Sequence, residues 1–196
     1  MTPVVISIAD KAEIPVNVSE ALRYLGVKTK DSLTELLVDE CIKEIYKVAE
    51  PKAVYCETEI TVDNDTVDFG FMRVKSEKLA KNLCECYKAY VFCATLGIGV
   101  DRQFERLNRV SPAKAAVFSA VGSSLVEELC DYVNETIVGE EVSKPRFSCG
   151  YGDFSLTHQS DILNILEAGK RLGVFLTESY MMVPVKTVTA VIGIRR

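Results

Sequence analysis

The sequence has few of the residues and motifs on which hydrolytic and phosphate-binding chemistry depend. Its 196 residues include a single histidine, His158, and no Gly-x-Ser-x-Gly motif accompanies it. A serine–histidine–acid site would depend on this one candidate, which is more typical of a polar residue at the start of a surface helix. No Gly-x-Gly-x-x-Gly opens a helix after a strand, and no Gly-Lys-Ser or Gly-Lys-Thr phosphate loop is present. Serine hydrolases and nucleotide-phosphate sites are therefore disfavoured.

The chain also lacks an excess of positive charge and long apolar runs. It carries 23 basic against 28 acidic residues, a net charge of -5, and no cluster of lysines and arginines. No apolar run approaches the roughly 20 residues that span a bilayer, and no basic region followed by a long apolar segment opens the sequence. We expect a soluble, cytoplasmic protein that binds neither nucleic acid nor membranes.

The seven cysteines show no pattern of disulfides or metal ligands. Their number is odd, and they are spread over helical and strand-like segments, which is typical of free thiols in a reducing compartment. Cys84 and Cys86 are separated by one residue instead of two, and Cys93 lies in an apolar run. We expect neither disulfides nor a metal site.

Helical periodicity covers much of the chain, and its 48% hydrophobic content is enough for one compact unit over residues 1–196. Asn17 and Ser32 are predicted to cap two helices, and Ser111 with Pro112 opens a long one. Helices are predicted over residues 17–25, 32–50, 76–87, 113–136 and 159–172.

Strands are predicted where apolar residues alternate or run continuously. Residues 54–62 and 67–71 alternate around a turn and suggest an antiparallel hairpin, and residues 89–95 suit a central strand that Gly97 and Gly99 end. Residues 185–194 form a last strand after Pro184. Helices and strands do not alternate regularly, so we predict an α+β fold with a mixed, largely antiparallel sheet and packed helices.

The segment 146–153 combines a cation, two glycines, an aromatic ring and an acid. The planar fork of Arg146 suits a carboxylate, although a surface ion pair is an equally open interpretation. Gly150 and Gly152 allow positive φ angles and leave room beside the main chain. Tyr151, between them, would be poorly buried by its own backbone, so it either covers a ligand or packs locally. One turn carrying these residues, Asp153 included, could grip a zwitterionic ligand and present the ring beside it.

One side of the predicted long helix brings small residues and acids together. Steps of three and four residues place on it Ala120, Ser123, Ser124, Glu127 and Asp131. The small residues allow close approach of another backbone, and the acids create a negative potential that suits a cationic group. A solvated acidic face beside an ordinary helix contact is the alternative.

Four motifs, in this order, resemble the reactivation domain of cobalamin-dependent methionine synthase, in a short free-standing form. They are Thr-Leu-Gly at 95–97, Leu-Val-Glu at 125–127, Arg-x-Ser-x-Gly-Tyr at 146–151, and Leu-Thr-Glu-Ser at 176–179 followed by Pro184. The resemblance covers residues 90–193, whereas residues 1–88 diverge. It implies the methionine synthase activation-domain fold.

The resemblance implies a function in repair. Such a domain binds S-adenosylmethionine and supports reductive methylation of cob(II)alamin, with one electron from a flavodoxin- or ferredoxin-like donor. This chain lacks the Asp-x-His-x-x-Gly signature of a cobalamin-binding module, so the cobalamin is expected on the cobalamin-binding core of a partner methionine synthase. The alternatives are a non-catalytic module that binds S-adenosylmethionine or a corrinoid protein, and a reactivator of another corrinoid methyltransferase.

The family's functional positions fall on five residues of this chain. The resemblance implies that Glu127 pairs with the ammonium or favours the sulfonium of S-adenosylmethionine, and that Arg146 binds its carboxylate. Ser148 and Gly150 match positions whose main chain lines the ligand, and Tyr151 matches the tyrosine that faces the corrin ring, the position implied to be catalytic. His158 is displaced by one position from the family's histidine, so no role is transferred to it.

Overall fold

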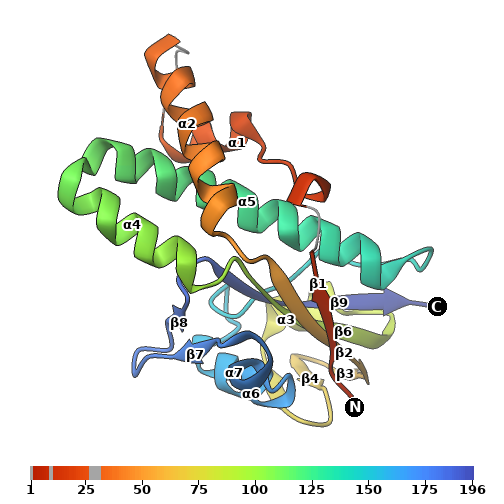
Figure 1. The fold of residues 1–196 in the computed structure, drawn as a ribbon. Helices are drawn as coiled ribbons and strands as arrows, with labels where there is room; N and C mark the ends of the chain where they lie inside the picture. The colour runs from red at the N-terminus through yellow and green to blue at the C-terminus, as the bar shows by residue number, and fades with distance from the viewer. Residues whose placement is uncertain (1, 9–10, 27–31) are drawn as a thin grey trace.

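A four-stranded antiparallel sheet with strand order β1-β2-β6-β9 forms the centre of the protein (Figure 1). The computed structural model describes residues 2–8, 11–26 and 32–196. The sheet strands are β1 (Val4–Ser7), β2 (Lys52–Glu59), β6 (Cys86–Thr95) and β9 (Thr187–Arg195). The predicted α+β class with antiparallel pairing is confirmed.

Both faces of this sheet are buried. On β6, Tyr90, Phe92 and Ala94 belong to the core on one face, and the alternating Val91 and Cys93 belong to the core on the other. A strand buried on both sides needs apolar residues at every position, which explains the continuous run that predicted it.

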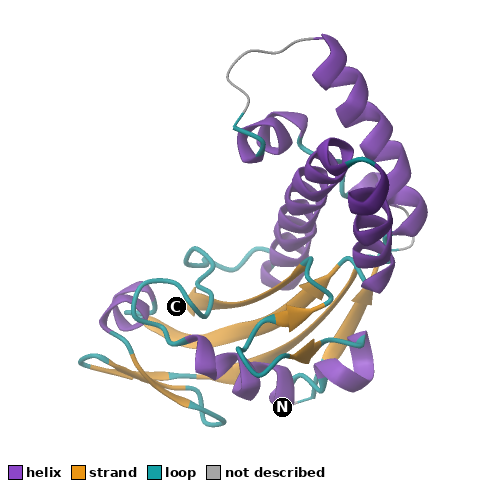
Figure 2. Cartoon of the chain, turned by 90° about the vertical axis from the view of Figure 1, so that its left-hand side faces the viewer, coloured by secondary structure: helices purple, strands orange, loops and turns teal. Residues whose placement is uncertain are grey.

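The larger helices cover the first face (Figure 2). They are α1 (Val18–Tyr24), α2 (Ser32–Val48), α4 (Ile98–Val110) and α5 (Pro112–Val138). The side-chain oxygen of Asn17 accepts the N–H of Glu20, and Ser111 caps α5 as predicted. The side chain of Ser32, on which the other predicted cap depends, lies outside the described residues. Among the helices that the structure describes, none is long and apolar enough to cross a membrane.

Shorter elements cover the second face (Figure 2). Helices α3 (Glu77–Asn82), α6 (Gln159–Ile165) and α7 (Ala168–Leu172) lie there with a three-stranded sheet of β3 (Thr61–Asp63), β4 (Thr66–Asp68) and β5 (Arg73–Lys75). The remaining elements are two 3-10 turns, η1 (Lys11–Glu13) and η2 (Leu156–His158), and the strand pair β7 (Phe175–Leu176) and β8 (Met182–Val183).

Helix α4 was missed by the sequence prediction, which took Gly97 and Gly99 only as the end of the preceding strand. Gly97 occupies the N-cap position with φ 81°. Gly99 lies in the first turn of the helix, where an added Cβ would stand 2.3 Å from the carbonyl oxygen of Val48. These glycines therefore let α4 begin close to the end of α2.

Other predicted boundaries were wrong for local reasons. The helix predicted over 76–87 ends at Asn82, because Glu85 takes φ 67° and β6 begins at Cys86. The helix predicted over 159–172 is two helices, separated at Glu167 with φ 50°. The hairpin joins β3 to β4, since β2 ends at Glu59 and pairs with β6 instead.

The early leucines of the α2 pattern also differ from the expected core positions. Leu33 and Leu36 follow the helical spacing, but both are largely exposed, whereas Cys41 and Ile45 further along the helix are buried. The first turns of α2 therefore extend beyond the elements that bury the rest of its apolar side (Figure 1).

The segment after α5 runs along the free edge of β9. Bridges pair Ser143 with Ile194 and Phe147 with Val191, and Phe147 exchanges both backbone hydrogen bonds with Val191, at 3.0 and 2.9 Å. This pairing extends the sheet by a short irregular strand. It fixes the position of Arg146, one residue before Phe147, beside α5.

Candidate functional site

The loop 146–153 is a hydrogen-bonded turn that two glycines make possible. Gly150 and Gly152 have φ angles of 86° and 62°, as their spacing predicted. The N–H of Gly150 donates to the carbonyl of Phe154 at 2.8 Å, and the N–H of Tyr151 donates to Ser148 at 3.1 Å. The turn is anchored by Phe154, whose ring is buried.

Asp153 ties this turn to the start of α3. Its carboxylate accepts hydrogen bonds from the Ser76 hydroxyl, from the N–H of Glu77 at 2.8 Å and from the N–H of Lys78 at 3.3 Å. These donors, the Ser76 hydroxyl first, lower the pKa of Asp153. Its oxygens are engaged by the helix start, so the acid expected to grip a ligand has a structural role instead.

Arg146 meets the acids of α5 directly, so the ion pair that was the alternative interpretation of this arginine is present. Its Nη2 lies 3.2 Å from Oε2 of Glu127, and its Nη1 pairs with Oδ1 of Asp131. The Arg146 side chain is 24% exposed. Burial alone would lower the pKa of Arg146, but the hydrogen bond with Asp131 and the nearby charges outweigh burial and raise it. The arginine is a fixed positive charge between two carboxylates.

Further negative charge surrounds this pair, where α1 packs on α5. Burial, together with the charges of Asp131 and Glu20, raises the pKa of Glu128. Burial and the charges of Glu20 and Glu127 likewise raise the pKa of Tyr24. Burial is the larger cause of both shifts, and the neighbouring acids add to it.

The small residues on this side of α5 make hydrogen bonds and close contacts with other segments of the protein. The hydroxyl of the buried Ser124 donates to the carbonyl of Asn17 at 2.9 Å, which is the close backbone approach that the sequence predicted. Ser123 accepts a hydrogen bond from Lys186 at 2.8 Å. A Cβ added at Gly122 would lie 3.2 Å from Cε of Lys186. The sequence interpretation did not single out Lys186.

Ser148 lines a hollow of about 440 Å³ under the turn. Burial raises the pKa of the neighbouring Cys149 to about 12, so this thiol stays protonated at neutral pH. The hollow is mostly apolar, and its lining also includes Leu156, Gln159, Thr177, Met181, Met182, Val183, Val185, Thr187, Val188 and Thr189. Thr187 and Thr189 belong to the part of β9 that lies beyond its pairing with Phe147.

Tyr151 lies at the tip of the turn and faces a different hollow. The residue is 72% exposed, and its ring contacts Phe147 edge to face, with centroids 6.0 Å apart. This hollow, of about 590 Å³, is also lined by Lys78, Lys81, Asn82, Lys144, Pro145 and Gly152. Ser148 and Tyr151 therefore line separate hollows.

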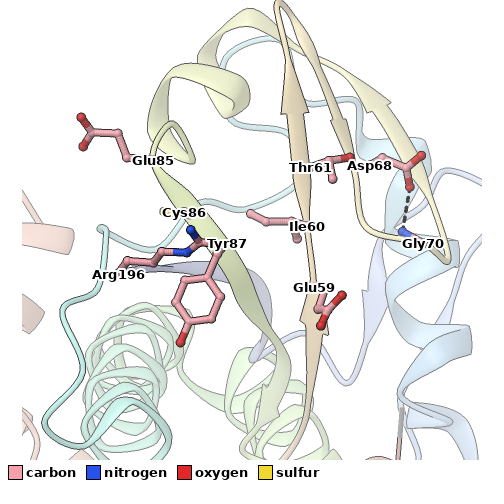
Figure 3. Close-up of a pocket in the computed structure, with 9 residues that line it drawn as sticks. All are labelled: Glu59, Ile60, Thr61, Asp68, Gly70, Glu85, Cys86, Tyr87 and Arg196. Carbon is pink, nitrogen blue, oxygen red and sulfur yellow. Dashed lines mark hydrogen bonds between the residues drawn. The ribbon is translucent and has the colours of Figure 1, made fainter.

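A third hollow, of about 660 Å³, contains none of the predicted site residues (Figure 3). The guanidinium of Arg196 lies over the Tyr87 ring at 5.7 Å, Asp68 accepts the N–H of Gly70 at 2.8 Å, and Glu85 points away from the others. The lining is Glu59, Ile60, Thr61, Asp68, Gly70, Glu85, Cys86, Tyr87 and Arg196. Its acids do not converge on one point, so size alone does not make it the site.

The remaining reactive side chains have ordinary structural settings. His158 lies at the start of α6, as predicted, with Nδ1 3.0 Å from Oδ2 of Asp161. All seven cysteines are free. Within the described part of the chain, no cluster of histidine, cysteine and acidic residues is arranged to hold a metal ion.

Comparison with known proteins identifies the fold. No protein-family model matches the sequence, and no curated protein matches it. The crystal structure of the MetH reactivation domain bound to AdoHcy aligns with 98% of this chain and 78% of its own, with a TM-score of 0.71 and 14% sequence identity. Identity this low shows the fold and nothing finer. The α+β fold of this protein is that of the MetH reactivation domain.

Proposed function

We propose that this protein binds S-adenosylmethionine and acts as an accessory protein in reactivating cobalamin-dependent methionine synthase, by reductive methylation of cob(II)alamin on the partner. The observation that carries the proposal is the meeting of Arg146 with Glu127 and Asp131, in the fold of a domain solved with AdoHcy. AdoHcy is what remains of S-adenosylmethionine once its methyl group has been transferred.

The charge of this region suits the methionyl end of the ligand. S-adenosylmethionine carries a sulfonium, an ammonium and a carboxylate, a net charge of +1, and carboxylates outnumber arginines where α1 meets α5. A guanidinium has five N–H donors. Arg146 therefore keeps donors for the ligand's carboxylate while Glu127 and Asp131 hold it in place. The same acids accept the ammonium or favour the sulfonium.

The other end of the ligand needs a flat, mostly apolar site. The hollow beside Ser148, of about 440 Å³, falls within the roughly 300–1,000 Å³ of small-molecule sites. Ser148 belongs to its lining, and Gly150 follows in the same turn with its N–H bonded to the carbonyl of Phe154. The adenosyl group therefore has a candidate position on the loop that carries Arg146.

Tyr151 would face the partner. Its exposed ring, held at the tip of a rigid turn, would pack against the partner-bound cobalamin. When bound, S-adenosylmethionine supplies an electrophilic methyl group to the partner's cobalamin, which a flavodoxin- or ferredoxin-like donor has reduced. Tyr151→Ala is expected to leave S-adenosylmethionine binding intact and to slow transfer, which single-turnover methylation measures. Loss of binding in this variant would remove Tyr151 from the partner-facing role.

Calorimetry with S-adenosylmethionine and AdoHcy tests the ligand. The sulfonium charge is expected to favour S-adenosylmethionine by about 1 kcal/mol, roughly fivefold in Kd, because partly exposed charges interact weakly. This preference should shrink as salt is added. Injections without heat at millimolar S-adenosylmethionine, both alone and with the partner, would contradict the proposal.

A transfer assay separates reactivation from the alternatives. Oxidised methionine synthase, an electron donor and S-adenosylmethionine labelled in its methyl group are combined with this protein, and label on cobalt supports catalysis. Binding without transfer would favour a non-catalytic module, which the direct pairing of Arg146 with both acids also suits. Transfer to a different corrinoid protein would change the partner and leave the ligand in place.

A further inference from the structure

A second cation reaches α5 about one helical turn before the Arg146 pair. Lys186, just before β9, donates from Nζ to the hydroxyl of Ser119 at 3.1 Å and to that of Ser123 at 2.8 Å. Gly122 leaves room for its stem. Lys88 and Lys114 each bind two carboxylates, whereas no carboxylate within the described residues forms an ion pair with Lys186.

Lys186 lines a small, partly open cavity, together with Ser119, to which its amine donates. The cavity holds about 180 Å³ and is lined by Val100, Asp101, Phe104, Glu105, Phe118, Ser119, Val185 and Lys186. A water molecule occupies about 30 Å³ in the liquid, so the space suits a molecule of a few heavy atoms. The two phenylalanines and two valines give it an apolar character. Val185 also lines the hollow proposed for the adenosyl group, but neither the Arg146 pair nor Ser148 or Tyr151 lines this cavity.

Asp101 supplies a carboxyl group on the same wall. Its Oδ2 accepts the N–H of Val185 at 2.8 Å, which fixes the carboxyl next to the lysine segment. Burial raises the pKa of Asp101 and lowers that of Lys186, although each charge partly offsets the shift of the other. Burial therefore disfavours the charged form of both the amine and the carboxyl group that line this cavity.

We propose that Lys186 forms a reversible imine with small aldehydes that enter this cavity. The nitrogen lone pair of the neutral amine attacks the aldehyde carbon, and one proton of that nitrogen passes to the former carbonyl oxygen to give a neutral carbinolamine. Asp101 donates a proton to the carbinolamine hydroxyl, which leaves as water as the carbon–nitrogen double bond forms. The nitrogen proton returns to the Asp101 carboxylate, so the step needs no further reactant. Desolvated lysines are activated in this way.

Reductive trapping of the whole protein tests this site. Propionaldehyde and cyanoborohydride at neutral pH convert any imine to a stable propyl-lysine, and peptide mass spectrometry gives the rate at each lysine. We expect Lys186 to react about tenfold faster than the exposed Lys47, well below the roughly 100-fold that a positioned general acid can supply. Equal rates, or faster reaction at Lys47, would overturn the proposal.

Two controls separate the pocket from local sequence. In urea the preference for Lys186 should vanish, and a preference that persists there would overturn the role of the fold. Asp101→Asn keeps an acceptor for the N–H of Val185 but removes the general acid, so Lys186 should lose most of its roughly tenfold advantage over Lys47. Glu105→Gln, which changes the other acid of the cavity, should change the rate less. No effect of Asp101→Asn would overturn the acid–amine pair.

Discussion

Two cations from the C-terminal half of the chain reach the same side of α5, and they meet different chemistry there. Ser119, Ser123, Glu127 and Asp131 follow one another at four-residue steps, which places them on a common face. Lys186 contacts the two serines, and Arg146 contacts the two acids.

The difference shows how one helix face produces two kinds of site. Carboxylates raise the pKa of Arg146 and keep its charge fixed, which suits electrostatic recognition of a ligand. Hydroxyls satisfy the hydrogen bonds of Lys186 without adding a negative charge, so burial lowers its pKa and favours the neutral nucleophile. The residue types along this helix face, more than its geometry, therefore determine the chemistry where Lys186 and Arg146 make contact.

The largest expected effect comes from removing the arginine. Arg146→Ala should weaken S-adenosylmethionine binding by about 1.5–3 kcal/mol, because a charged hydrogen bond to the ligand's carboxylate is lost. Calorimetry measures this change. Arg109→Ala, at the exposed end of α4, is the matched control and should leave binding unchanged. If Arg146→Ala lowered the stability of the protein and left affinity unchanged, the arginine would be structural.

Much of the central sheet was predictable because its pattern is local. Alternation from Val54 to Ile60 and the apolar run into Thr95 predicted the two middle strands, and each is buried as the patterns require. Helix α4 was not predictable in the same way. The need for a glycine at position 99 comes from the carbonyl of Val48, about fifty residues earlier, and no local pattern encodes that contact.

The individual residues of the site could be predicted from the sequence, but the contacts between them could not. Helical spacing placed Glu127 and Asp131 together, and motif similarity marked Arg146. Their direct pairing depends on the run of residues 143–147 along β9, a tertiary pairing that spacing does not encode. Asp153 was expected to belong to a ligand-gripping turn, but it caps a helix that begins 76 residues earlier.

A larger side chain at position 122 should disturb the packing of Lys186 against α5 and leave the Arg146 ion pairs unchanged. Gly122→Val would crowd Lys186 and Ile45, with the first added carbon already 3.2 and 3.3 Å from them. Overpacking of this kind costs about 1–3 kcal/mol in the free energy of unfolding, which urea titration measures. Ala116→Val, exposed on the same helix, reports the intrinsic effect of valine. Equal losses in the two variants would show that crowding at Gly122 contributes nothing.

Neutralising one acid should have a smaller effect on ligand binding. Glu127→Gln keeps a side chain of the same shape but removes one negative charge, and Asp131 still holds Arg146. S-adenosylmethionine affinity should fall by about 1 kcal/mol, as for other partly exposed charges. Glu135→Gln, two turns further along α5 and exposed, should change it little. If both variants weakened binding equally, the net charge of the protein would be responsible, not the position of Glu127.

The smallest expected effect is a difference in pH dependence between the two cations. The pKa of Lys186 is below its ordinary value of 10.5 in the folded state. Between the two pKa values the unfolded chain binds more protons than the folded one, so this lysine makes the free energy of unfolding rise with pH. Lys186→Met removes the effect, so the free energy of unfolding of wild type should rise relative to that of this variant as the pH increases from neutral towards 10.5.

The pKa of Arg146 is raised above an already high value, so the difference in unfolding free energy between wild type and Arg146→Met should not change over this range. Urea titrations at several pH values measure both differences. If the free energies of unfolding of wild type and Lys186→Met changed with pH in parallel, Lys186 would keep its charge beside the two serines as firmly as Arg146 does beside the two acids.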